Sequence, residues 1–359
     1  VKEVYLCHRI NHKKRKMKKN LRNILALSLG LMTTVVFAQD WNVDSRTRID
    51  MGGDNDRMIT NQRATVGATW SGSDWGIHVS SDLNYMLSNQ AATGELGMDI
   101  YEAYASTDLM GYASLTAGRQ ALNYGSGALM SSNDWAPNRT TWDGFTFGLD
   151  LDMADITVGY ASNNMGGEDV ESNGNMYLNA GGEFSGWNVN LLYMTQTVNG
   201  ESGDAATGLD ISGELMGASI SASMNNDGNE GEMLDLGVSY AVNDDMTAMV
   251  GMTTYGDVAF TMAGTNMSGG LAGSGQLGYL GANDEDLSIG VTYNMAGIDL
   301  GATMHMITNS EDEAYERDVM EISLAYSLND NSSLGVKYAT DATGDVDTKY
   351  TWLTLTVRP

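Results

Sequence analysis

Residues 287–293 read LSIGVTY, in which Ile289, Val291 and Tyr293 alternate with small or polar residues. The same order of apolar, any residue, apolar, any residue and Tyr recurs along the chain. The segments that carry it end at Tyr160, Tyr193, Tyr240, Tyr293, Tyr326 and Tyr338. A period of two is that of a β-strand with one apolar face, whereas a helix repeats about every 3.6 residues. The chain after residue 38 is therefore predicted to be all-β.

The Tyr that ends each segment distinguishes two kinds of all-β protein. A secreted soluble β-sandwich and a membrane β-barrel both have strands with one apolar face. In a barrel, aromatic girdles flank the apolar band at the membrane-water interface, which suits an amphipathic ring. The repeated terminal Tyr therefore favours a transmembrane barrel.

The connections between the predicted strands alternate in length, as in antiparallel up-and-down barrels of the outer membrane. Short turns are expected near residues 71–74, 108–111, 151–154, 185–186, 216, 243–245, 295–297 and 329–331. Longer acidic stretches, rich in Gly or Asn, include 163–175, 225–231, 257–285, 308–317 and 341–348. Pairing strands across the long loops gives about 18 strands, within a range of roughly 16 to 20 because residues 257–285 have room for another hairpin. A barrel of this size leaves an aqueous lumen.

This topology fixes the expected orientation of the barrel. Its strands begin at Trp41 and end at Val357, and both ends lie on the periplasmic side. The outer girdle then contains Tyr160, Tyr193 and Tyr338, and the inner girdle contains Tyr240, Tyr293 and Tyr326. The final strand, KYTWLTLTVRP, resembles the signal read by the barrel-insertion machinery, with Pro359 in place of the usual terminal aromatic residue.

The first 38 residues differ in composition from the rest of the chain. They hold nine of the 19 Lys and Arg but one of the 46 Asp and Glu, which leaves 10 basic and 45 acidic residues after residue 38. From Met17, a basic stretch, an apolar stretch and a cleavage site ending at Ala38 have the layout of a secretory signal peptide. We expect residues 1–16 to be a start-codon artefact, residues 17–38 to be removed, and residues 39–359 to form a barrel in the outer membrane of a Gram-negative bacterium.

Composition and charge exclude several functions. A net charge of −27 argues against nucleic acid as a partner, because phosphate contacts need clustered Lys and Arg. One Cys and four His leave little for a metal site, and no cofactor is predicted. No Ser-His-Asp order, paired-carboxylate motif or phosphate-binding loop is present, so an enzyme is not predicted. Acidic clusters at Asp54/Asp56, Asp284 to Asp286 and Glu311 to Glu313 suit either divalent cations at the cell surface or solvated loop charge.

Strand alternation also predicts which side chains face the lumen. In the first strand Val43 and Ile49 share a face, and the charged residues of the opposite face point inward, because a charge on lipid costs about 2 to 4 kcal/mol at mid-bilayer. The pore-lining residues predicted from the first four strands are Arg46, Arg48, Arg63, Asp82 and Glu102. They form either a solute-selecting strip or a structural ion-pair cluster.

A long central segment, Gly118 to Gly148, is too rich in apolar and aromatic residues for a solvated loop. The side chains that need burial are Leu122, Tyr124, Leu129, Met130, Trp135 and Trp142. A loop of a wide barrel can bury such residues by folding into the lumen. We therefore expect this segment to form the constriction.

The same segment resembles the alginate-export family of bacterial outer-membrane channels, whose members carry a GRQ-aromatic-Gly run followed by a Trp, an Arg and an aromatic-Asp-Gly. The matching positions are Gly118, Arg119, Gln120, Leu122, Tyr124, Gly125, Asp134, Trp135, Arg139, Trp142, Asp143 and Gly144. The resemblance implies a porin-like channel of about 18 strands. It adds Arg119, Tyr124, Asp134, Trp135 and Arg139 to the candidate pore residues. Alginate exporters have an arginine-rich pore, whereas this chain is acidic and poor in Arg, which favours small hydrophilic solutes over alginate.

The predicted function is passive diffusion of small hydrophilic solutes, anions or saccharides among them, through an outer-membrane porin. The alternative is an adhesin or a surface structural barrel that uses its acidic, cation-binding loops. Ion conductance in a planar bilayer distinguishes the two.

Overall fold

The computed structural model describes residues 38–52, 55–87, 97–136, 139–151, 153–162, 174–195, 197–198, 201–261 and 279–359. Apart from Ala38, the expected start-codon artefact and signal peptide lie outside these ranges. Residues 40–359 form one unit. In the described part of the chain, no helix is long and apolar enough to span a membrane.

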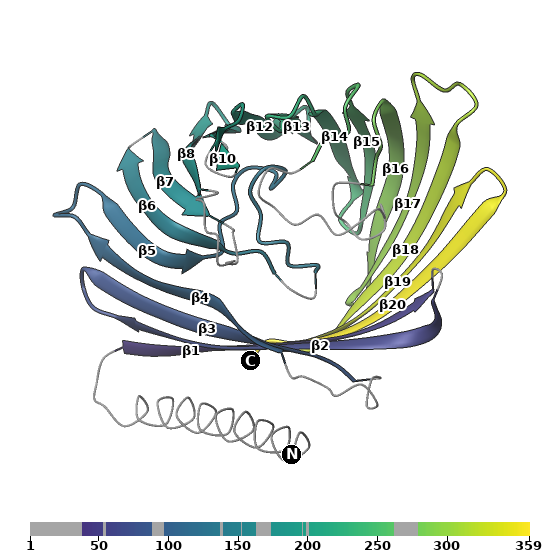
Figure 1. The fold of residues 1–359 in the computed structure, drawn as a ribbon. Coiled ribbons are helices and arrows are strands. Elements are labelled where there is room, and N and C mark those ends of the chain that lie inside the picture. The colour runs from purple at the N-terminus through teal and green to yellow at the C-terminus, as the bar shows by residue number, and fades with distance from the viewer. Residues whose placement is uncertain are drawn as a thin grey trace, which may run out of the picture. The chain divides into compact units, whose positions relative to one another are not determined.

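The described residues form one large sheet of 18 strands and one small hairpin (Figure 1). The hairpin consists of β10 (Thr197–Val198) and β11 (Glu201–Ser202). The strands of the large sheet are β1 (Ala38–Gly52), β2 (Asn55–Ser71), β3 (Trp75–Met86), β4 (Gly97–Asp108), β5 (Ser114–Gln120), β6 (Trp142–Leu151), β7 (Ala154–Ser162), β8 (Gly174–Phe184), β9 (Trp187–Met194), β12 (Ala206–Leu215), β13 (Ala218–Asn226), β14 (Glu232–Asn243), β15 (Met246–Tyr255), β16 (Asp284–Met295), β17 (Ile298–Asn309), β18 (Glu316–Asn329), β19 (Ser332–Thr343) and β20 (Val346–Val357).

The large sheet is an antiparallel meander that closes on itself. Strands that follow one another in the chain are neighbours in the sheet, and β9 pairs with β12 across the small hairpin. The sheet closes because β1 pairs with both β2 and β20, with Ser45 opposite Val357. The predicted all-β, up-and-down barrel of about 18 strands is therefore confirmed, with 18 strands in the closed sheet.

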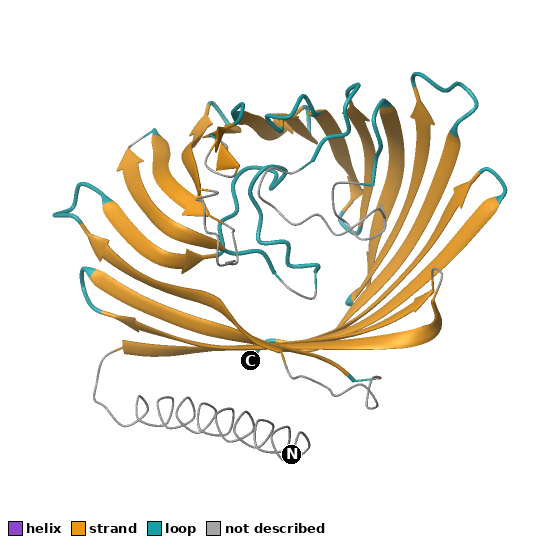
Figure 2. Cartoon of the chain, viewed as in Figure 1, coloured by secondary structure: helices purple, strands orange, loops and turns teal. Residues whose placement is uncertain are grey.

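The barrel has a turn end and a loop end, and the short turns of the turn end lie where the sequence predicts them (Figure 2). Three pairs of strands are joined by two residues that both have positive φ: Ser185-Gly186, Met216-Gly217 and Ala296-Gly297. These are the angles of a type I′ turn, whose twist matches that of the flanking strands. Met110-Gly111 has the same angles at the tip of the β4–β5 connection.

One predicted long loop, residues 341–348, is a tight turn instead. Strand β19 continues to Thr343 and β20 begins at Val346, so that Asp341 lies opposite Thr348 in the ladder. Gly344 adopts the left-handed conformation that the tight turn requires, with φ at +57°. Asp, Thr and Gly favour loops locally, but here the ladder with β20 determines the conformation, and the prediction of a long loop was wrong.

The two faces of the wall carry the side chains that strand alternation predicts. Val66 and Ile77 are 43% and 44% exposed on the outer face, whereas Arg63 and Asp82, in the opposite phase, are each 3% exposed on the inner face. Tyr193 is exposed near the loop end of its strand. Three other tyrosines are exposed near the turn ends of their strands: Tyr240, Tyr293 and Tyr326. These positions agree with two aromatic girdles.

The apolar core lies inside the barrel, at the loop end. It joins inward-facing wall residues to residues of the two long segments between β5 and β6 and between β15 and β16. The wall contributes Trp142, Tyr177, Met194, Met233 and Ile307, and the segments contribute Leu122, Leu129, Met130, Phe260 and Leu280. The predicted inward folding of the central segment is therefore observed, and it narrows the lumen at this end.

The outward and inward faces of β16 give a direct test of the wall. Changing Val291 to Arg should impair membrane insertion far more than changing Thr292 to Arg, because an Arg on the lipid face costs up to about 2 to 4 kcal/mol whereas the inner face is hydrated. The fraction of protein with heat-modifiable gel mobility after insertion into vesicles measures the difference. Equal insertion of the two variants would contradict the assignment of the faces.

Candidate pore constriction

The described residues between β5 and β6, 121–136 and 139–141, cross the lumen, and we call them the crossing segment (Figure 1). Its first half reaches the wall formed by β8, β12 and β13. The hydroxyl of Tyr124 lies 3.4 Å from that of Tyr177 on β8, and Ser223 on β13 donates a hydrogen bond of 3.0 Å to Ser126. Leu129 packs against Gly208 of β12.

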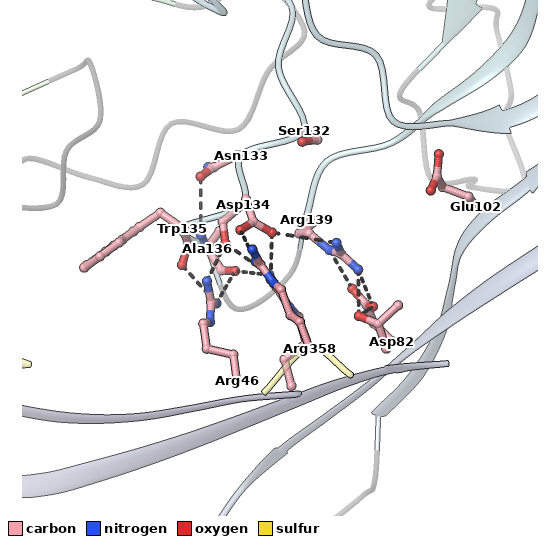
Figure 3. Close-up of polar contacts among 12 residues, drawn as sticks. Arg46, Asp82, Glu102, Ser132, Asn133, Asp134, Trp135, Ala136, Arg139 and Arg358 are labelled. Carbon is pink, nitrogen blue, oxygen red and sulfur yellow. Dashed lines mark hydrogen bonds and ion pairs between the residues drawn. The ribbon is translucent and has the colours of Figure 1, made fainter. Parts of the chain in front are cut away.

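The second half of the crossing segment returns to the opposite wall, where β1 and β2 meet (Figure 3). Arg46 of β1 donates to the carbonyl oxygens of Trp135 and Ala136 at 3.1 and 3.0 Å, and also to that of Asp134. Arg63 of β2 donates to the carbonyl oxygens of Asp134 and Ala136 and forms an ion pair of 2.7 Å with the Asp134 carboxylate. Two guanidinium groups thus hold one turn of backbone against the wall.

Aromatic packing extends this contact toward β20. The guanidinium carbon of Arg48 lies 3.7 Å from the ring centre of Trp135, and its Nη1 donates to the Trp135 carbonyl oxygen at 2.9 Å. The other side of the contact is Trp352, whose ring meets that of Trp135 edge to face at 5.7 Å. Trp135 is therefore fixed between a cation of β1 and an indole of β20.

A second, separate ion pair anchors the crossing segment to β3. Arg139 makes two hydrogen bonds with the carboxylate of Asp82, at 2.6 and 3.0 Å, and a third to the hydroxyl of Thr65. Its guanidinium lies 3.3 Å from the ring centre of Tyr101 on β4. A bidentate Arg-carboxylate pair fixes orientation as well as distance, so Arg139 is held by β2, β3 and β4 together.

The charge of Asp134 is stabilised by the arginines around it. Burial raises the pKa of this carboxyl, but Arg63, followed by Arg46 and Arg139, outweighs burial and holds the pKa below its ordinary value. Asp134 is therefore ionised at neutral pH. The three arginines Arg46, Arg48 and Arg63 outnumber the carboxylates near them, so this side of the lumen has an excess of positive charge.

The structure brings together seven of the ten predicted pore residues and separates three. Arg46, Arg48, Arg63, Asp82, Asp134, Trp135 and Arg139 form the contacts described above. Tyr124 lies at the other end of the crossing segment, against β8. Glu102 is at the root of the segment, where its Oε1 accepts a hydrogen bond from the Ala121 amide, and Figure 3 shows it apart from the arginines.

Arg119 lies on the outer face of the wall, contrary to the prediction that it lines the pore. Its neighbour Gln120 is buried on the inner face, and Arg119 itself forms a bidentate pair of 2.7 Å bonds with Asp143. Asp143 has the same phase as Phe145, which is exposed on the outer face. The position of Arg119 was inferred from the family resemblance, whereas strand alternation from Trp142 places it outside.

Sequence reasoning missed a second charged group on the inner face, on β16 to β19. His305 lies 2.7 Å from Asp286 and 3.7 Å from Glu321, and Lys337 lies 3.2 Å from Glu321. Lys337 is also 5.9 Å from the ring centre of Trp135, so this group reaches the arginine side of the lumen. The same alternation that identified Arg46 places His305, Glu321 and Lys337 inside.

We expected the acidic residues from Asp284 to Asp286 to form a cluster at the surface, and the structure does not place Asp284 and Asp286 there. Asp284 and Asp286 are buried and make hydrogen bonds inside the barrel, to Asn309 and Tyr279 among others. Asp54/Asp56 falls outside the residues whose side chains are described. Among the described residues, no group of three or more His, Cys, Asp or Glu side chains is arranged to hold a metal ion.

Small residues line the lumen between the crossing segment and the turn end. Ser212, Ser221, Gly237, Gly251 and Gly290 contribute to a hollow of about 550 Å³ along β12 to β17. Short polar side chains leave the lumen wide here. The crossing segment therefore narrows the passage, with arginines on one side and, nine strands away around the barrel, the acidic Asp210 of β12 on the other.

The comparisons with known proteins concern the fold. No protein-family model and no curated protein matches the chain, so the resemblance to alginate-export channels receives no support from them. The outer membrane protein OpdK of Pseudomonas aeruginosa matches with 12% identity and a TM-score of 0.71, over 90% of this chain and 100% of that one. OccK9 (OpdG) of the same organism matches with 14% identity and a TM-score of 0.69, over 90% and 99% of the two chains.

A third structure, OccAB4 of Acinetobacter baumannii, matches with 11% identity and a TM-score of 0.65, over 89% of this chain and 98% of that one. OpdK has also been crystallised with vanillate, in a structure that matches with a TM-score of 0.70. At these identities the likeness concerns architecture and not residues. The chain has the barrel fold of these proteins along nearly their whole length.

Proposed function

We propose that the chain is a channel of the outer membrane of a Gram-negative bacterium, through which small hydrophilic solutes diffuse passively. The observation that carries this proposal is the lumen itself. A wall of 18 strands encloses a space too wide for its own side chains to fill. The crossing segment narrows that space without replacing its charged lining.

The charges support anions or saccharides as solutes. Arg46, Arg48 and Arg63 face two carboxylates, Asp134 and Asp50, and the acidic Asp210 lies on the opposite wall, so the lumen carries a transverse field. In a narrow passage with low-dielectric walls, such a field acts strongly on solutes. The likeness to OpdK, which was solved with vanillate, makes a small aromatic carboxylate a reasonable probe of this chain. Residues 102–109 and 118–144 carry the finer resemblance to alginate-export channels.

Conductance in a planar bilayer tests the proposal. We expect the purified, refolded chain to form discrete ion-conducting steps, and liposomes that contain it to swell in glucose and in sodium vanillate. Liposomes without protein are the control. A folded, heat-modifiable barrel that neither conducts nor lets these solutes enter would contradict the proposal and favour the alternative of an adhesin that uses exposed acidic loops such as Glu311 to Glu313.

A further inference from the structure

One arc of the turn end is apolar at its tips. Of the four turns between β4 and β13, three carry large exposed apolar side chains, namely Met110, Tyr112, Met153 and Met216, which are 90%, 83%, 70% and 95% exposed. The fourth, Ser185-Gly186 between β8 and β9, is polar. Water would surround the apolar side chains if the turns projected into solution, and exposing large apolar groups to water is unfavourable. We propose that this arc of turns lies in the boundary between headgroups and acyl chains of the adjacent membrane leaflet.

The turns outside this arc are mostly polar, which makes the arc a distinct feature. Residues 72–74 between β2 and β3 read GSD, 244–245 between β14 and β15 read DD, and 330–331 between β18 and β19 read DN. Met295, before the β16–β17 turn, is the exception, and it is half exposed on the strand and not at the turn tip. Such polar side chains are typical of turns that project into water.

Backbone conformation does not explain the methionines. Met110 and Met216 occupy left-handed positions, with φ at 61° and 54°, in turns where the first position favours Asn, Asp or Gly. Met is not among the residues that this turn position favours, and both side chains are almost fully exposed. An apolar environment beyond the turn accounts for both observations.

Strand length places this arc at the edge of the membrane. Within the arc, β5, β7, β9 and β13 have 7 to 9 residues and β4, at its edge, has 12, whereas β16, β17, β19 and β20 have 12 residues each. At about 3.3 Å per residue and a tilt of about 40°, a 9-residue wall is about 23 Å tall, close to the apolar band of about 25 Å. A 12-residue wall is about 30 Å tall and reaches beyond that band. The turns of the short sector therefore lie at the boundary, and those of the long sector project past it.

An aromatic residue of the inner girdle lies at the same depth. A Cβ added to Gly217 would be 3.9 Å from the ring of Tyr240, and Tyr240 is paired with Ala218, the first residue after the turn. Tyr at an outward position next to a turn marks the interface. Met216 precedes Gly217, so it shares that interface, and the apolar belt of the outer wall continues without interruption into the turn.

The proposal rests on the barrel spanning a membrane and not on which solute passes through it. Spin labels at single Cys residues test it, in a chain whose Cys7 has been changed to Ser. The labelled variants are Met110→Cys and Met216→Cys, with Asp244→Cys and Asp330→Cys in polar turns as matched controls and Ile289→Cys, on the outward face of β16, as the lipid control. The protein is inserted alone into phosphatidylcholine vesicles, and the accessibility of each label to oxygen and to a water-soluble nickel complex is measured.

We expect the ratio of oxygen to nickel accessibility at Met110 and Met216 to approach that at Ile289 and to exceed that at Asp244 and Asp330 several-fold. Ratios equal to those of the polar turns would overturn the proposal and would point to a protein partner as the occupant. If the oxygen-to-nickel ratio at Ile289 were as low as for a label in water, the barrel would not span the membrane. Both the proposed channel and this inference would then be contradicted. The result at Ile289 therefore separates the two failures.

A pair of variants separates a membrane contact from a role in the turn. Asn is favoured at the first position of a type I′ turn, so Met110→Asn and Met216→Asn should leave the thermal stability of the detergent-folded barrel unchanged or higher. The same changes should lower the fraction that inserts into vesicles. Unchanged insertion would contradict the proposal, and Asp244→Asn serves as the control that should alter neither quantity.

Discussion

Deleting residues 126–138 should raise the single-channel conductance by roughly twofold or more while the barrel still folds, because a barrel of 16 to 18 strands leaves an aqueous lumen and the deletion removes most of the segment that crosses it. The deletion removes the contacts to both walls, those of Ser126 and Leu129 on one side and those of Asp134 to Ala136 on the other. The strands and their ladders remain. Heat-modifiable gel mobility checks folding, and planar bilayer recording measures conductance.

A shorter deletion of exposed residues provides the matched control. Removing Glu311 to Glu313 shortens the β17–β18 connection, which lies outside the crossing segment. Its conductance should stay close to that of the parent chain. If the deletion of residues 126–138 also left conductance unchanged in a folded barrel, the constriction would lie elsewhere in the lumen.

The strand pattern could be predicted because the wall meets two different environments. Lipid outside and water or polar side chains inside impose a period of two on every strand, so residues such as Ile289 and Arg63 could be assigned to a face from the sequence alone. The end of β19 could not be predicted in this way. Asp341, Thr343 and Gly344 have the composition of a loop, and their extended conformation depends on ladder partners in β20.

The sequence predicts most of the residues that form the site but not the groups to which they bind. Alternation placed Arg46, Arg48 and Arg63 inside, and composition identified the segment that would fold onto them. Their main partners are the backbone carbonyl oxygens of Asp134, Trp135 and Ala136, which carry no signal in the sequence. Each guanidinium holds the crossing segment, as the interpretation of a structural cluster requires. The other interpretation, that the arginines select solutes, stays a prediction.

Replacing Arg46, Arg48 and Arg63 together by Ser should shift the reversal potential in a salt gradient toward cation preference and should also raise conductance. The shift follows because the substitution removes the excess positive charge from one side of an otherwise acidic lumen. The rise follows because the carbonyl oxygens of residues 134–136 lose their donors. The shift should be largest at low salt, where the Debye length grows from about 10 Å at 0.1 M to about 30 Å at 0.01 M.

Two variants separate the charge of the arginines from their hydrogen bonds. Replacing the same three residues by Lys keeps the charge but loses the planar fork that reaches several carbonyl oxygens at once, so conductance should rise with little change in ion preference. Asp134→Asn removes a negative charge from the same place and should shift preference toward anions. Arg119→Ser is the matched control, because Arg119 is paired with Asp143 on the outer face and its loss should not change ion preference.

The size of the effect depends on how far Asp134 and Asp82 already compensate the basic side chains. Asp82 is committed to Arg139, at 2.6 Å. Asp134 faces Arg63 and Arg46, and Asp50 of β1 interacts electrostatically with Arg48. Two carboxylates thus face three guanidinium groups, which leaves roughly one uncompensated positive charge in a confined, weakly screened space. An unchanged reversal potential in the Ser variant would show that this charge is screened from the solute path, and the arginines would then act as a clamp for the crossing segment alone.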